Sequence, residues 1–175
     1  MDQNERRQML ALLTEGTQAI HAAASGIDDA DAARRPANGS WSVLDCLEHV
    51  AVTERALFAG IRNATKAEAP QPNPEREAKI WNRALDRARF IAAPDIVVPH
   101  GNFTNAAQAL LNFATARAET VQWVETFADD PRAWITTHPM VRGPVNCWEM
   151  LLMIALHPKR HAEQIAHIRA ALNHH

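Results

Sequence analysis

Two histidines near the C-terminal end of the chain are spaced for joint metal binding. His157 and His161 lie four residues apart in the run LHPKRHAEQIAHI, which has the residue pattern of a helix. Because residues i and i+4 of a helix share one face, the two imidazoles can reach a single ion. Apolar residues on the same face predict that both rings point into the protein: Ile154, Ile165, Ile168 and Leu172. Two core histidines hydrogen-bonded to carboxylates or carbonyls are the alternative interpretation.

A third metal ligand should come from another helix, since catalytic zinc sites commonly combine three protein ligands with one position open to water. His49 is the best candidate, because it falls two turns into a second predicted helix, at the border of its apolar stripe. Taken alone, His49 would be interpreted as a half-buried core or surface histidine. Cys46 lies one turn earlier and could add a thiolate to the site, although a small buried core residue is the commoner outcome.

The elements that must position these side chains are helices. The spacing of apolar residues predicts four long helices, over residues 2–24, 42–61, 104–127 and 146–172, and a shorter outer helix over 75–90. Ser42 with Asp45, and Asn146 with Glu149, mark the starts of the two helices that carry the histidines. We expect loops at the Asp-rich run 27–31 and over the long stretch that ends at Pro144. The pattern predicts an all-α fold, a four-helix bundle with long crossover connections and a short extra helix.

The two histidine segments together resemble a known family. GSWSVLDCLEHV, followed at the far end of the chain by HPKRHAEQIAHI, is similar to the DinB-like metal-binding family, which includes bacillithiol-transferase-like proteins. The resemblance spans the whole chain and implies a four-helix bundle in which His49, His157 and His161 bind a divalent cation. Trp41 and Gln164 also fit the family pattern.

Pro158 departs from that pattern. It removes the helical amide hydrogen bond to Ile154 and crowds the Ile154 carbonyl, so we expect a kink. The kink could aim His157 at the cation, or it could mark a site that has drifted from the family; the sequence leaves both open. In H-E-x-x-H metalloproteases the residue after the first histidine is the glutamate base, so Pro158 excludes that mechanism. No catalytic residue is assigned.

Several further side chains have two interpretations each. Arg117 interrupts an apolar line, and it could hold a substrate carboxylate, although a snorkelling side chain or a partner for an internal glutamate is favoured. Glu54, Glu163 and Gln164 could orient imidazole N–H groups, but exposed helix positions explain the two glutamates equally well. The segment 134–144 could form a lid over the site, whereas core packing or a dimer contact is the usual role of its tryptophan.

Composition limits the classes of function. The 175 residues suit a single domain over 1–175. The formal net charge of −2 gives no broad electrostatic attraction for phosphates, so we expect no nucleic-acid partner. The charged N-terminal segment and the lack of a long apolar run predict a cytoplasmic protein with no membrane span. Cys46 and Cys147 are expected to be free thiols, since one pair gives no disulfide framework.

Three functions remain open at this point. The first is a metal-dependent thiol transferase or hydrolase, because the resemblance implies relatives that join a low-molecular-weight thiol to an electrophile at a three-histidine centre. The cation would be zinc or nickel, with manganese or iron as alternatives. The expected partners are a small-molecule thiol or electrophile and, in a homodimer, a second copy of the chain. The second is a non-catalytic, stress-related module that binds a metal or small ligand. The third is a structural helical protein whose histidines bind nothing.

Overall fold

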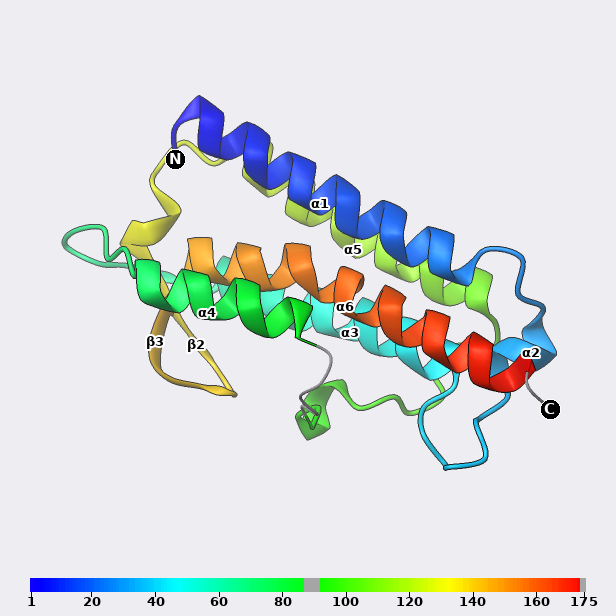
Figure 1. Cartoon of the computed structure of the whole chain (residues 1–175). Helices are drawn as coiled ribbons and strands as arrows, with labels where there is room; N and C mark the ends of the chain where they lie inside the picture. The colour runs from blue at the N-terminus through cyan, green and yellow to red at the C-terminus, as the bar shows by residue number, and fades with distance from the viewer. Residues whose placement is uncertain (87–91, 174–175) are drawn as a thin grey trace.

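Four long helices form a bundle in the computed structural model, which describes residues 1–86 and 92–173 (Figure 1). They are α1 (Gln3–Ala24), α3 (Val43–Arg62), α5 (Ala106–Thr126) and α6 (Cys147–Asn173). Both α1 and α3 pack against α5 and against α6, which brings the histidine-bearing helices α3 and α6 side by side. The predicted four-helix bundle is confirmed.

The helix starts depend on the residues that the sequence suggested. The Ser42 side chain accepts a hydrogen bond from the Asp45 amide, and the Asp45 carboxylate accepts one from the Ser42 amide, so α3 begins with a capping box. Asn146 and Glu149 exchange the same pair of bonds, at 2.9 Å each, at the start of α6. These reciprocal bonds satisfy amides that have no partner inside the helix and fix where each helix begins.

A long crossover joins α3 to α5, because these two helices run in the same direction (Figure 1). It contains β1 (Thr65–Lys66), α4 (Pro74–Leu85) and the 3-10 turn η1 (Asp95–Val97). Asn73 caps α4 and Pro74 occupies its first turn, where a missing amide hydrogen costs nothing. The helix packs on α6, as expected of an outer helix. Of the predicted range 75–90, residues 87–90 lie outside the described residues.

Two of the predicted loops were wrong. The stretch before α6 contains the 3-10 turn η2 (Pro131–Ala133) and an antiparallel hairpin of β2 (Trp134–His138) and β3 (Val141–Asn146), which form a sheet in the order β1-β2-β3. Pro144 suggested a loop, but β3 is an edge strand, where a proline need not donate to a neighbour. The Asp-rich run contributes the short helix α2 (Asp29–Ala33), because the Asp28 side chain caps it by accepting from the Asp31 amide.

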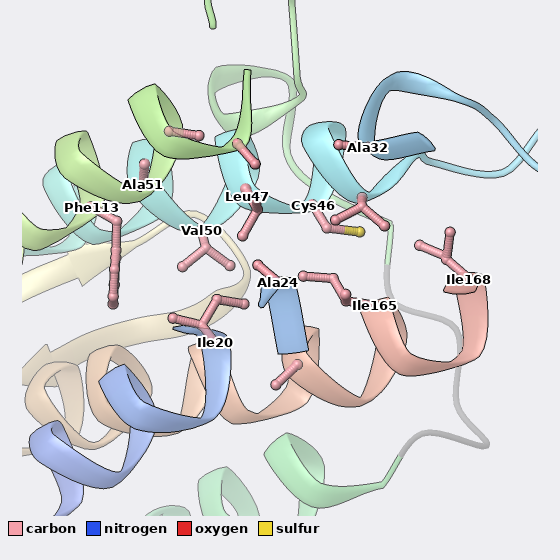
Figure 2. Packing of buried hydrophobic residues seen from close by; sticks show 14 of the residues in the cluster. Ile20, Ala24, Ala32, Cys46, Leu47, Val50, Ala51, Phe113, Ile165 and Ile168 are labelled. Carbon is pink, nitrogen blue, oxygen red and sulfur yellow. The ribbon is translucent and has the colours of Figure 1, made fainter. Parts of the chain in front are cut away.

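Buried apolar side chains from all four long helices fill the interior. One cluster joins Ile20 of α1, Leu47 and Val50 of α3, Phe113 of α5 and Ile165 of α6 (Figure 2). Its close packing holds α3 and α6 at the fixed separation that a shared metal site requires. Among the helices of the described residues, none is both long and apolar enough to cross a lipid bilayer.

Candidate metal centre

The three histidines singled out from the sequence come together between α3 and α6. His49 projects from α3, and His157 and His161 project from successive turns of α6. One ring nitrogen of each lies within 4.8 Å of those of the other two. His49 and His161 are buried, at 5% and 6% exposure, while part of His157 reaches the surface. The cluster is therefore largely buried, and His157 is its most exposed member.

The distances between the rings suit a single ion. Nε2 of His49 lies 3.1 Å from Nε2 of His157, and the ring centroids of the three histidines are 4.4 to 4.9 Å apart. Two nitrogens bound to one zinc ion at a tetrahedral angle lie roughly 3.4 Å apart, given zinc–nitrogen bonds of about 2.0–2.1 Å. The donor set thus suits a divalent cation, and the separation of the His49 and His157 nitrogens is close to this value.

A backbone carbonyl determines which nitrogen of His49 faces the cluster. Nδ1 of His49 lies 2.7 Å from the carbonyl oxygen of Val97, in the turn η1. Because a carbonyl can only accept, Nδ1 carries the hydrogen and Nε2 is left with its lone pair towards His157. Partners of this kind orient metal-binding histidines and raise their basicity. No residue pattern pointed to Val97, because its contribution comes from the main chain.

Glu48 holds the segment that carries Val97. Its carboxylate, 1% exposed, accepts hydrogen bonds from the backbone amides of His100, Gly101 and Asn102 and from the side-chain amide of Asn102. Gly101 has a φ of +76°, a backbone conformation that other residues rarely adopt. Adjacent residues of α3 therefore have complementary roles: Glu48 fixes the loop, and His49 donates to it.

The surroundings of His49 and His157 favour their neutral forms. Burial lowers the pKa of His49 from its usual value, and the hydrogen bond to Val97 offsets this shift only in part. The pKa of His157 lies well below its usual value, chiefly because the ring is desolvated and also because His161 and His49 lie beside it. Neutral imidazoles have the lone pair that a metal ion needs.

Trp41 forms one wall of the site. Its ring centroid lies 4.9 Å from that of His49 and 6.4 Å from that of His161, with the second pair stacked. It directly precedes the capping residue of α3, so the capping box that starts the helix also places this indole. An apolar wall excludes water from the buried imidazoles and strengthens electrostatic interactions inside the site.

Other candidates from the sequence lie away from the cluster. Cys46 is fully buried in the apolar core (Figure 2), and the group of candidate metal ligands among the described residues contains the three histidines without it. Cys46 and Cys147 are both reduced and outside any disulfide, as predicted. Glu163 is exposed, in agreement with one of its two interpretations, and Gln164 is half-buried. Trp134 lies in β2 rather than in a loop that could cover the site.

The substrate-binding interpretation of Arg117 was wrong and the internal ion pair is confirmed. Nη2 of Arg117 lies 2.9 Å from Oε2 of Glu54, and both side chains are almost completely buried. The other Glu54 oxygen accepts from the Thr120 hydroxyl at 3.0 Å. Glu54 is therefore neither exposed nor bonded to an imidazole, so both interpretations of this residue were wrong.

Fold and site together define a class of protein, a helical bundle with a cluster of three histidines that could hold a metal ion. The chain belongs to the DinB superfamily, whose sequence pattern matches residues 12–165. Its fold is similar to that of YfiT from Bacillus subtilis, described as a probable metal-dependent hydrolase with an unusual four-helix bundle topology. The TM-score is 0.59 at 15% sequence identity, over 99% of this chain and 89% of the YfiT chain, so the similarity is one of fold. No curated protein matches the chain.

Proposed function

We propose that the protein is a metal-dependent enzyme that holds one divalent cation with His49, His157 and His161 and acts on a small molecule by thiol S-transfer or hydrolysis. The convergence of one nitrogen from each of these three rings within 4.8 Å carries the proposal. Imidazole ligands suit zinc and nickel, which we favour, with manganese and iron as alternatives.

The residues around the site suggest how a nucleophile would be formed. A divalent cation bound by three imidazoles lowers the pKa of a water molecule or a thiol that coordinates to it. Of the buried carboxylates on α3, Glu48 is bonded to backbone amides and Glu54 to Arg117. Neither is placed to take a proton from a substrate, so the nucleophile would depend on the cation rather than on a protein base.

We further propose a low-molecular-weight thiol and an electrophile as substrates of the transferase reaction. The resemblance to DinB relatives that join such a thiol to an electrophile supports this choice. The description of YfiT as a probable metal-dependent hydrolase supports hydrolysis instead. The two reactions differ only in whether a thiol or water is the nucleophile at the same centre.

Metal analysis and turnover test the proposal together. Protein purified without a histidine tag is expected to contain about one equivalent of metal, because a single three-histidine group lies among the described residues. Model electrophiles are then offered with bacillithiol, mycothiol, glutathione or coenzyme A, and in parallel with water alone, in the presence of zinc or nickel. A metal-dependent rate with one nucleophile selects the reaction. No metal-dependent rate with any of them would contradict the enzymatic proposal.

Matched variants on α6 identify the ligands. His161→Ala is expected to abolish stoichiometric zinc binding, because two imidazoles are too few to hold the cation. His167→Ala is the control, since His167 is exposed on the same helix. Retained stoichiometric binding in His161→Ala would contradict the assignment of the site.

A non-catalytic binding module is the second candidate, favoured by the engagement of Glu48 and Glu54 in structural contacts. Removal of the metal with a chelator separates the two functions. An enzyme loses its rate, whereas a module without activity loses only the stabilisation that the metal contributes to the folded state, seen as a lower melting temperature.

A further inference from the structure

Pro158 leaves one carbonyl of α6 without its helical donor. In a regular helix the amide of residue 158 would donate to the carbonyl of Ile154, and a proline has no amide hydrogen. The affected turn runs directly into His157, which contributes a ring nitrogen to the metal centre. A buried carbonyl without a donor is costly, so its actual partner bears on the site.

That partner is Arg117 of α5. Its Nη2 donates to the Ile154 carbonyl over 3.2 Å, and its Nη1 donates to the carbonyl of Leu13 in α1 over 3.1 Å. Arg117 is 4% exposed, and the 2.9 Å contact of its guanidinium with Glu54 of α3 balances the charge. One side chain therefore ties all four long helices together at the proline turn.

A second, independent feature accommodates the same turn. Gly16 of α1 packs so closely on α6 that a Cβ atom there would lie 2.5 Å from the carbonyl oxygen of Ala155 and 3.7 Å from Cγ of Pro158. Only glycine allows this approach without a backbone shift. Side chains of α3 and α5 and a glycine of α1 thus meet at this one turn of α6.

We propose that Arg117 is a positioning residue of the metal centre. By donating a hydrogen bond to the Ile154 carbonyl, Arg117 replaces the amide hydrogen that Pro158 lacks. This bond fixes the turn of α6 that aims His157 at the cation. This inference rests on the proposed metal binding. Glu54 supports it by holding the guanidinium in place. Arg117 acts through the backbone of α6 and does not itself touch the cation or a substrate.

The inference predicts a specific coupling between Arg117 and Pro158. Removal of Arg117 should harm the site only while residue 158 lacks an amide hydrogen. In Pro158→Ala the new amide can donate to the Ile154 carbonyl, and the arginine becomes dispensable for metal binding. A purely structural role of the buried ion pair predicts the same loss of affinity whichever residue occupies position 158.

A double-mutant cycle measures this coupling. Since Arg117→Met alone leaves Glu54 buried without a counter-charge, it is combined with Glu54→Gln, which can still accept from Thr120. Zinc affinity is measured by competition with a chromophoric chelator, once with Pro158 in place and once in the Pro158→Ala background. We expect a loss of about tenfold with Pro158, the equivalent of one hydrogen bond, and of less than about twofold in the Pro158→Ala background. Cobalt-substituted protein should show altered absorption bands only where the proline is present.

Two further variants keep the test decisive. Glu54→Gln alone leaves the buried Arg117 charge unbalanced, so it is also measured in both backgrounds. A loss of equal size whichever residue occupies position 158 would assign the effect to the ion pair and overturn the inference. If the combined variant does not fold, Arg117→Lys replaces it in the cycle, because one ammonium keeps the charge but lacks the two terminal nitrogens of the guanidinium. Equal losses in both backgrounds, or no loss with Pro158, would overturn the inference while leaving metal binding intact. A wild-type protein that binds no zinc would overturn the proposed function as well.

Discussion

Glu48→Gln is the substitution whose consequences follow most directly from the structure. Each oxygen of the Glu48 carboxylate accepts two hydrogen bonds: Oε1 from the His100 amide and the Asn102 side chain, and Oε2 from the amides of Gly101 and Asn102. A glutamine of nearly the same shape offers one oxygen and one NH2 group. Whichever carboxylate oxygen the NH2 group replaces, two hydrogen-bond donors of the loop then face this group, which is itself a donor.

The magnitude follows from these contacts. Hydrogen bonds to a charged group contribute about 1.5–3 kcal/mol each, and Glu48 is 1% exposed, so water cannot replace those that are lost. Allowing for relaxation of the loop, we expect the free energy of unfolding of the metal-free protein to fall by about 2–4 kcal/mol. Zinc affinity should fall by about tenfold or more, because the same loop presents the Val97 carbonyl to His49.

Urea unfolding of the metal-free protein gives the free energy of unfolding, and competitive zinc titration gives the zinc affinity. Glu163→Gln is the matched control, since Glu163 is exposed on α6, two residues after the proposed ligand His161. The control should stay within about 0.5 kcal/mol of the wild type. If Glu48→Gln behaves like the control in both assays, the loop does not depend on this carboxylate and the reasoning is refuted.

Three other perturbations test separate features of the molecule. Acidification should lower the free energy of unfolding of the metal-free protein from about pH 6.5 downwards, because histidines of the unfolded chain bind protons there, whereas the lowered pKa values of His49 and His157 delay protonation in the folded state. Changing both residues to Gln should flatten the pH dependence of the unfolding free energy in urea, and an unaltered slope would count against neutral rings. Gly16→Ala should lower the free energy of unfolding by about 1–3 kcal/mol in the same assay, because its Cβ would lie 2.5 Å from a backbone oxygen of α6. Gly60→Ala is the control and should cost less, because its Cβ would meet the flexible end of a methionine at 3.0 Å; equal losses would show that the close approach is unimportant. Pro158→Ala should weaken zinc binding while the melting temperature stays the same or rises, and unchanged affinity would separate the proline from the site.

The meeting of the three histidines was largely predictable because most of its signals are local. Four-residue spacing placed His157 and His161 on one face, and the residues of the capping boxes fixed the helices that carry all three rings. Such signals depend on residues close together in the sequence, so they can be recognised without knowledge of the fold.

The supporting contacts were not predictable, since each joins segments distant in the chain. Val97 contributes a carbonyl, which every residue has, and Glu48 looks like any helix glutamate until the loop that it holds is known. The sequence indicated an internal glutamate as the partner of Arg117 but could not identify Glu54, or the Ile154 carbonyl freed by Pro158. The homodimer stays a prediction.

The hairpin was missed for a related reason. Gly143 and Pro144 are typical of loops, and only the pairing of β2 with β1 on its other side makes β3 an edge strand that tolerates a proline. Strand identity here depends on neighbours that come together only in the folded chain.

A crystal structure of zinc-soaked protein, with anomalous scattering recorded at the zinc edge, tests the central claim most directly. We expect one strong peak between α3 and α6, about 2.0–2.1 Å from a nitrogen of each of His49, His157 and His161, with at least one further coordination position left to solvent or substrate. Absence of zinc between these rings at neutral pH, or zinc bound there by only one or two of them, would contradict it.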